Sequence, residues 1–222
     1  MFLFLKTENK FMKVVQIYDE SKEEKFAAEI FKKILMSFIY DWKIERIEIH
    51  LSSKDSVELV GDTGKIYINR DNFFIRSMDD LGIGSIFLER VMELILLING
   101  IGLTYSSRIQ KLTKDFLIDR LLIRRFDGFI FHKNLSRLLA IKLETKDEWL
   151  EANLLCEVFY KYDDWARQYL RAIVNKKKTK GSEDITNKIN MILDKFDESI
   201  KTESDFIKAM KEIEAIYNSI SN

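Results

Sequence analysis

The sequence predicts an α+β protein, in which a small mixed sheet with a backing helix and a buried central helix precedes an all-helical C-terminal half. Three observations predict this class. Short strand-like runs are confined to residues 11–69, an almost wholly apolar helical stretch follows them, and no strand pattern appears after residue 103. Apolar residues recur at every second position in strands and at roughly every third or fourth position in helices, so the change of period separates the two halves.

The first half is expected to alternate strands and helices. Ser21 and Glu24 form a capping box, which predicts that an amphipathic helix begins there. The run from Gly61 to Gly64 predicts a hairpin turn between two short strands. The expected elements are, in chain order, a strand over 11–18, a helix over 21–40, a strand over 44–51, and short strands over 57–60 and 65–69.

The helix expected over 85–99 is apolar on almost every side. Such a helix packs in the middle of a domain rather than on its surface. Gly100 and Gly102 follow it, and one of them is expected to end the helix in a left-handed conformation. Gly82 and Gly84, which precede the apolar stretch, are interpreted as a flexible lead-in.

The second half is predicted to be helical throughout, because its apolar residues recur with helical spacing. Helices are expected near 106–125, 131–143, 146–175, 184–200 and 203–220. Lys176 to Ser182 is a polar interruption and is interpreted as a linker. The predicted organisation is an α+β domain over 1–125, a helical extension packed on it over 126–175, and a C-terminal helical hairpin over 183–222.

The predicted C-terminal helical hairpin has a consequence for the oligomeric state of the protein. Each of its two helices carries an apolar stripe, and an isolated helix pair buries too little area to be stable alone. The hairpin is therefore expected to dock either on its own chain or on a second copy. We expect self-association, with a homodimer as the simplest form.

The composition argues against two classes of partner, nucleic acids and membranes. Lysine plus arginine and aspartate plus glutamate are equal at 36 each, so the formal net charge is zero. Binders of nucleic acid or of anionic membranes normally show a basic excess, and we expect neither partner. The apolar run Leu94 to Ile98 is too short to span a membrane, and residues 1–6 are too short for a signal peptide, which predicts a cytoplasmic location. Enrichment in lysine, glutamate and isoleucine is also typical of a thermophile.

The chain is poor in the ligands that zinc prefers. Cys156 is the single cysteine, and His50 and His132 are the two histidines. Zinc is bound mainly through nitrogen and sulfur, so an all-protein zinc site here would need carboxylates for most of its ligands. We expect no metal or other cofactor. Cys156 lies in an apolar stretch and is expected to behave as a small hydrophobic residue.

A candidate catalytic frame lies in the apolar helix, where Leu88, Glu89 and Met92 occupy the first, second and last positions of a His-Glu-x-x-His motif. Asp115 and Asp119 follow on a later predicted helix with a spacing of four. Together with the order of strands and helices, this pattern resembles the N-terminal half of zincin-like metallopeptidases, in particular the small single-domain gluzincins. The resemblance implies that Glu89 matches the general base, Asp115 the third zinc ligand and Asp119 the carboxylate that orients a ligand histidine.

Both histidine positions of that frame hold apolar side chains, Leu88 and Met92. Catalytic zinc takes typically three protein ligands and keeps one position open for water. The first interpretation is therefore a metallopeptidase-like domain that has lost its zinc site. In such a pseudoenzyme Glu89, Asp115 and Asp119 are vestigial, and the function is binding or assembly without chemistry.

Two alternatives stay open. The first is a hydrolase, such as a peptidase, with an oxygen-only site for magnesium or calcium. Its ligands would be Glu89, Glu93, Asp115 and Asp119. Acids at these spacings are more often solvated or paired with basic residues, for which Arg120, Arg124 and Arg125 are the expected partners. The second alternative is a helical protein-interaction module unrelated to zincins.

The expected partner is a protein or a second copy of the chain, bound through the helical C-terminal half. An aromatic patch lies there, near Arg167 and Arg171. Its members are Tyr160, Tyr162, Trp165 and Tyr169. Aromatic residues and arginine are enriched at the energetic centres of protein interfaces. The patch is either helix-packing material or a protein contact surface.

Overall fold

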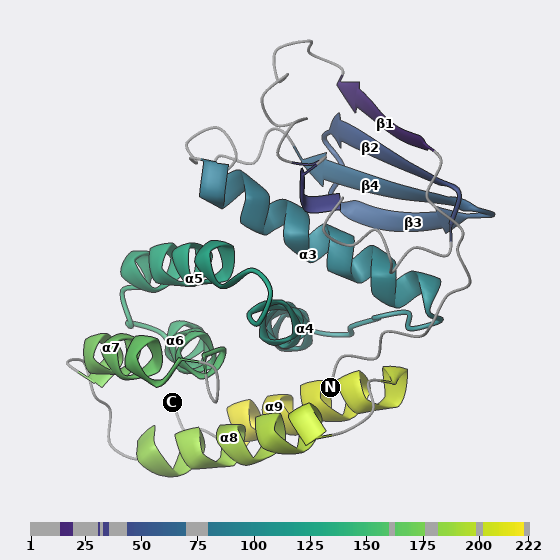
Figure 1. The fold of residues 1–222 in the computed structure, drawn as a ribbon. Coiled ribbons are helices and arrows are strands. Elements are labelled where there is room, and N and C mark those ends of the chain that lie inside the picture. The colour runs from purple at the N-terminus through teal and green to yellow at the C-terminus, as the bar shows by residue number, and fades with distance from the viewer. Residues whose placement is uncertain are drawn as a thin grey trace. The chain divides into compact units, whose positions relative to one another are not determined.

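The structure is a computed structural model, which describes residues 14–19, 31, 33–35, 44–69, 80–159, 163–175, 182–198 and 202–219. Most of the helix expected over 21–40 and most of the linker expected over 176–182 lie outside these residues. The chain divides into two compact units, residues 1–102 and residues 103–222 (Figure 1).

Among the described residues of unit 1, four strands form one mixed sheet in the order β1-β2-β4-β3. Strand β1 runs parallel to β2, β2 runs parallel to β4, and β3 pairs antiparallel with β4. The strands are β1 (Val14–Asp19), β2 (Arg46–Ser52), β3 (Ser56–Val60) and β4 (Thr63–Asn69). The predicted α+β class with a small mixed sheet is confirmed.

Alternation of side chains gives this sheet one apolar face. Ile47, Ile49 and Leu51 of β2 and Ile66 and Ile68 of β4 are all buried, whereas the residues between them are partly exposed. Successive side chains of a strand point to opposite faces, so these five residues share one face. That face is the part of the sheet that packs into the core of unit 1.

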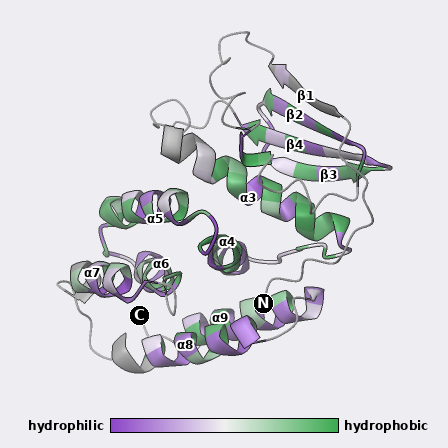
Figure 2. Ribbon diagram, viewed as in Figure 1, coloured by the Kyte–Doolittle hydropathy of each residue, from purple (hydrophilic) through white to green (hydrophobic). Residues whose placement is uncertain are grey.

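Helix α3 (Asp80–Ile98) covers the apolar face and contacts β3 and β4. Phe87, Leu88 and Leu94 are completely buried, and Figure 2 shows α3 as mostly hydrophobic, with hydrophilic residues near its middle. The predicted buried central helix is confirmed. The phenyl ring of Phe31, which is itself buried, stacks on Phe87 with 4.2 Å between ring centroids.

The two ends of α3 differ in how well the sequence predicts them. Gly100 has a φ of +79°, and its N–H donates to the Leu97 carbonyl while the N–H of Ile101 donates to the Leu96 carbonyl. This is the Schellman arrangement of a left-handed cap, as predicted. The predicted start was wrong: α3 begins at Asp80 and includes Gly82 and Gly84, which were interpreted as a lead-in. Gly84 is buried, so packing on the core outweighs its low helix propensity.

Unit 2 is helical throughout its described residues, as predicted. Its helices are α4 (Arg108–Leu122), α5 (Asp127–Ala140), α6 (Lys146–Glu157), α7 (Asp164–Asn175), α8 (Ser182–Glu198) and α9 (Glu203–Ser219). Helix α4 contacts α5, α6 and α9, and α8 contacts α9 and α6. The sequence predicts a first domain over 1–125 that would include α4, whereas the division of the chain falls between Gly102 and Leu103.

The helix predicted over 146–175 is in fact two helices. Helix α6 ends at Glu157, and α7 begins at Asp164 after Asp163, whose carboxylate accepts a hydrogen bond from the N–H of Ala166 at 2.9 Å. No glycine or proline marks this break in the sequence. The chain turns there because α6 and α7 pack against each other and share buried charges.

The apolar stripes of α8 and α9 are covered by helices of their own unit. The stripe residues Ile189, Phe196, Phe206 and Ile213 are buried, and the rings of Phe196 and Phe206 meet edge to face at 5.0 Å. Helix α9 packs on α4 as well as on α8. Of the two docking surfaces that the sequence left open for this hairpin, the structure contains the one on its own chain. None of the helices in the described part of the chain has the length and apolar composition needed to cross a membrane.

Candidate functional site

The first pair of candidate acids lies on α3. Glu89 and Glu93 are each at least nine-tenths buried. Glu93 accepts a hydrogen bond from the guanidinium of Arg90, and Arg90 Nε lies 3.1 Å from a carboxylate oxygen of Asp55 in the loop between β2 and β3. Arg90 therefore bridges two acids and compensates the charge of Glu93 in the low-dielectric interior of unit 1.

The second pair of candidate acids lies on α4. Asp119 is completely buried, and Lys133 of α5 donates hydrogen bonds to both of its carboxylate oxygens, at 2.8 and 2.9 Å. Asp115 lies 3.5 Å from the ammonium of Lys114. The resemblance implied that Asp119 orients a ligand histidine; in the structure both of its oxygens are engaged by a lysine. This is an ordinary buried ion pair with full hydrogen bonding.

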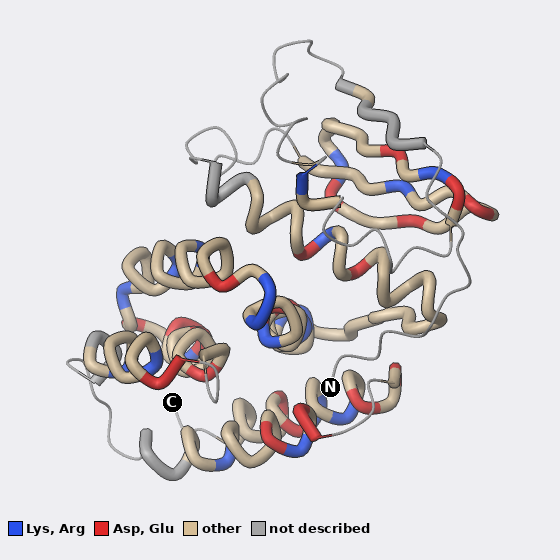
Figure 3. Tube along the Cα trace, viewed as in Figure 1, with Lys and Arg blue, Asp and Glu red and all other residues tan. Residues whose placement is uncertain are grey.

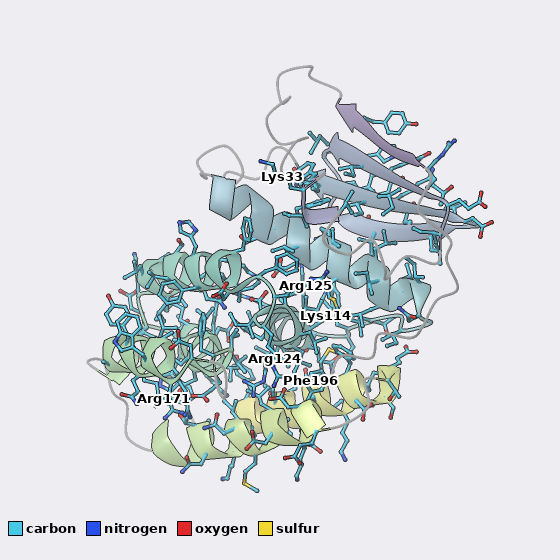
Figure 4. The ribbon with its side chains drawn as sticks, viewed as in Figure 1. Lys33, Lys114, Arg124, Arg125, Arg171 and Phe196 are labelled. Atoms are coloured by element: carbon cyan, nitrogen blue, oxygen red, sulfur yellow. The ribbon has the colours of Figure 1, made fainter. Side chains whose placement is uncertain are left out.

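The basic partners that the sequence suggested have other contacts. Arg120 pairs with Asp197 of α8, with Nη2 to Oδ2 at 2.7 Å, and also donates to the backbone carbonyl of Glu157. Arg124 and Arg125 are exposed at the end of α4, and the Arg125 guanidinium lies 5.8 Å from the ring centroid of Phe126 (Figure 4). Lys133, the actual partner of Asp119, was missed because its position on another helix is not marked by any local spacing.

The four candidate acids do not all belong to one compact unit. Glu89 and Glu93 belong to unit 1, and Asp115 and Asp119 belong to unit 2. Within the ranges that the structure describes, no group of three or more histidine, cysteine, aspartate or glutamate residues is arranged to hold a metal ion.

A second buried charge cluster lies at the junction of α6 and α7, and sequence reasoning missed it. Glu157 is completely buried and accepts hydrogen bonds from Arg167 Nε at 3.2 Å and from Arg171 Nε at 2.8 Å. With its side-chain amide oriented to satisfy both atoms, Asn190 of α8 donates to Glu157 and accepts from both arginines. The only sequence signal for this site was an acid inside an apolar run, followed later by two arginines one helical turn apart.

The charge cluster holds α7 in one orientation. Ala166 and Leu170 are buried on the same side of α7 as the two arginines, so this inner face is fixed by both apolar and ionic contacts. Figure 4 labels Arg171 on α7, and Figure 3 shows acidic and basic residues interspersed along the helices of unit 2. The outer face of α7 is consequently presented to solvent in a defined position.

Two aromatic side chains stand on that outer face. The side chains of Trp165 and Tyr169 are 69% and 46% exposed, and their rings stack nearly parallel, with centroids 5.6 Å apart and an interplanar angle of 7°. We call Trp165 and Tyr169 the aromatic pair. Tyr160 and Tyr162, the other members of the predicted patch, lie outside the described residues. Between the two interpretations of the patch, the exposure of the aromatic pair favours a contact surface over helix packing.

The remaining candidates are ordinary structural residues. His50 stacks between Tyr18 and Tyr67, with ring centroids 4.7 and 4.8 Å away, and its Nε2 lies 3.4 Å from Glu48. Cys156 is buried, and burial raises the pKa of its thiol to about 12, so it is not a nucleophile near neutral pH. His132 is half-buried on α5.

Comparisons with known proteins do not connect these features to a family. A scan against protein-family models found no matching family, and searches of curated proteins and of solved structures found no match either. The resemblance to zincins stays a prediction. A proposal for the function therefore depends on the geometry of the chain itself.

Proposed function

We propose that this protein acts by binding another protein, without chemistry of its own, and that the aromatic pair on α7 is the centre of the contact surface. The observation that supports this proposal is the exposure of Trp165, at 69%, on a helix whose opposite face is fixed by buried charges. Tryptophan, tyrosine and arginine are the residue types that most often dominate the energy of protein interfaces. Large aromatic side chains also lose little conformational entropy on binding, because each has two rotatable side-chain bonds.

A fixed platform suits binding. Arg167 and Arg171 donate hydrogen bonds to Glu157 of α6 on the inner face of α7. The rings of Trp165 and Tyr169 can therefore contact a partner without a rearrangement of α7. Preorganised surfaces bind more tightly, because their conformational entropy is lost during folding and not during binding. The partner is expected to carry an apolar pocket that accepts the indole ring.

Site-specific photo-crosslinking tests this proposal. A photoreactive phenylalanine analogue replaces Trp165 in the cells that naturally produce the protein, and a matched control places it at Met191 of α8, which is 60% exposed. The expected result is a protein adduct at position 165 that is absent at position 191. Absence of any adduct specific to position 165 contradicts the proposal.

A binding measurement with the purified partner completes the test. Trp165→Ala and Tyr169→Ala are each expected to weaken binding by roughly ten-fold or more, as for an interface hot spot, and Met191→Ala is expected to leave it unchanged. Equal affinity of the parent and both aromatic variants would place the contact surface elsewhere.

The proposal includes the loss of a zinc site, which rests on the apolar residues Leu88 and Met92 in the frame around Glu89. Elemental analysis of the purified protein tests this part. Stoichiometric zinc or magnesium that is lost from a Glu89→Gln or Asp119→Asn variant would instead support the hydrolase alternative.

A further inference from the structure

Helix α3 is followed by an asparagine and a glycine, Asn99-Gly100, a pair that occurs once in the sequence. Both residues are exposed. Asparagine is a thermolabile residue, because the backbone nitrogen of the next residue can attack its side-chain carbonyl carbon. Glycine favours that attack, since it has no side chain to obstruct the approach and it restricts the backbone least. The covalent chemistry of this pair therefore predisposes Asn99 to deamidation.

The reaction at this pair is a defined sequence of bond changes. The backbone nitrogen of Gly100 loses its proton to hydroxide and bonds to Cγ of Asn99. The bond from Cγ to Nδ2 breaks, and Nδ2 takes a proton from water and leaves as ammonia. Water then opens the cyclic succinimide, and cleavage between Cγ and the nitrogen gives aspartate, whereas cleavage at the backbone carbonyl carbon of residue 99 gives isoaspartate. The net change consumes water and releases ammonia, without oxidation or reduction.

In the folded protein both reacting groups are held by hydrogen bonds. The N–H of Gly100 donates to the Leu97 carbonyl at 3.0 Å, so the attacking nitrogen keeps its proton. Nδ2 of Asn99 donates to the Ile95 carbonyl at 2.8 Å, which directs the side-chain amide back toward the preceding turn of α3. An amide in such a hydrogen bond exchanges its proton with solvent only after the bond opens. The closed end of α3 therefore blocks the first step.

We propose that Asn99-Gly100 is a deamidation site that the left-handed cap of α3 controls. While the cap is closed the pair does not react, and each opening of the cap exposes Cγ of Asn99 to attack by the Gly100 nitrogen. The ends of helices open more readily than their interiors. The last turn of α3 therefore sets the rate at which the protein is modified.

The product cannot rebuild the same cap. Aspartate at position 99 lacks the Nδ2 donor that bonds to Ile95, and it places a negative charge at the C-terminal end of α3, where the helix dipole disfavours it. Isoaspartate adds a carbon atom to the backbone, which shifts the N–H groups of Gly100 and Ile101 from the carbonyls to which they donate. Deamidation therefore leaves the end of α3 more open, and the change accumulates with the age of each molecule.

This inference goes beyond the proposed binding function, because it concerns unit 1 and a covalent change in the chain itself. Trp165→Ala, which removes the centre of the proposed contact surface, is expected to deamidate at the rate of the parent chain. Failure of the proposed function and failure of this inference are therefore distinguishable.

Peptide mapping by mass spectrometry of the full chain tests the site. The protein is incubated in mildly alkaline buffer, folded in one sample and unfolded by urea in another. Aspartate and isoaspartate are expected at position 99 in both, with a rate at least about ten-fold lower in the folded sample. Asn99→Gln is the control and is expected to stay unmodified at this position, because its longer side chain would require a larger ring. Equal rates in the two samples would contradict control by the cap, and an unmodified Asn99 in the unfolded sample would contradict the site itself.

Hydrogen exchange identifies the opening that matters. Below the unfolding transition, added urea is expected to raise the deamidation rate of Asn99 and the exchange rate of the Gly100 amide by the same factor, because both require the same N–H to leave the Leu97 carbonyl. The amide of Leu94, which is completely buried in α3, reports global unfolding. A deamidation rate that follows Leu94 and not Gly100 overturns control by the cap.

A variant that imitates the product tests its effect on the fold. Asn99→Asp is expected to speed exchange of the Gly100 and Ile101 amides by roughly four-fold or more, through the lost hydrogen bond and the added charge. Asn218→Asp is the matched control, since Asn218 is exposed in the last turn of α9 and the substitution adds the same charge there. It is expected to leave both amides unchanged. Exchange at Gly100 and Ile101 that is as slow in Asn99→Asp as in the parent overturns the opening of α3 by deamidation.

Discussion

At the scale of single residues, the acids that sequence spacing marked as candidate ligands are engaged in ion pairs. Lys133 binds both oxygens of Asp119, and Arg90 binds Glu93. Burying a charge is costly unless a partner and hydrogen bonds compensate it. Removing one partner of such a pair therefore lowers the free energy of unfolding far more than replacing both partners with apolar residues.

Lys133→Met is expected to lower the free energy of unfolding by about 3–5 kcal/mol, because it leaves the Asp119 carboxylate buried without a partner. The double variant Asp119→Leu with Lys133→Met is expected to recover most of that loss. Urea unfolding monitored by circular dichroism measures both, with Lys208→Met, at an exposed position of α9, as the control. A double variant as unstable as the single one would show that the pair is needed for more than charge compensation.

Cys156 is expected to be inert in the folded protein. Burial, together with the nearby Glu157 carboxylate, raises the pKa of its thiol from 9.0 to about 12. Because the folded-state pKa is raised, the stabilisation from keeping the thiol neutral is fully present below pH 9 and is lost as the pH rises through about 12. At pH 8 a thiol reagent should modify Cys156 only as fast as the protein opens, and urea should accelerate the reaction. Rapid labelling in buffer, at the rate of a free thiol, would contradict the buried placement.

At the scale of elements, close approach of α3 to the sheet depends on one glycine. A Cβ atom at Gly64 would lie 2.7 Å from a methyl carbon of Leu94 and 2.8 Å from one of Ile44. Real side chains do not approach this closely, so α3 or its side chains would have to move. Gly102, in contrast, has an ordinary φ and open space around the position of a Cβ atom.

Gly64→Ala is expected to lower the free energy of unfolding by about 1–3 kcal/mol through overpacking between β4 and α3. Gly102→Ala is the matched control and is expected to change it by less than about 0.5 kcal/mol, as for a surface substitution. Thermal and urea unfolding of the two variants measure the difference. If both substitutions have the same small effect, the contact between α3 and β4 is looser than described.

At the scale of the whole molecule, the chain consists of two compact units that meet between Gly102 and Leu103. Unit 2 has its own core, formed where α4 contacts α5, α6 and α9 and closed by the packing of α8 on α9. A unit with its own apolar core can fold independently of the rest of the chain. The aromatic pair lies on unit 2, so residues 103–222 contain the proposed contact surface.

Residues 103–222, produced alone, are expected to fold into a helical protein with a cooperative urea transition. The reason is that the buried charge network around Glu157 and the stripes of α8 and α9 are satisfied within this unit. Far-ultraviolet circular dichroism and the fluorescence of Trp149, which is buried, provide the readouts. A fragment that is unfolded or that melts without cooperativity would show that unit 1 is required for its stability.

Patterns that depend on neighbouring residues were predictable. The alternation of isoleucine and leucine indicated β2 and β4, and the apolar sequence of α3 indicated a buried helix. Gly100 and Gly102 indicated a left-handed cap at one of the two positions, and the structure has it at Gly100. Each of these depends on the local period of the backbone or on the conformation that one residue allows. The start of α3 was less predictable, since packing of Gly84 outweighs its intrinsic preference.

The sequence by itself determined the α+β class, the order of most elements and the apolar faces that form the core, because these follow from side-chain period and turn chemistry. Only the tertiary structure decided that Lys133 pairs with Asp119, that the chain turns after Glu157, and that Trp165 faces solvent. These outcomes depend on distances between residues far apart in the chain. An ion pair forms where packing brings two charges together and removes water from them, and no local spacing contains that information.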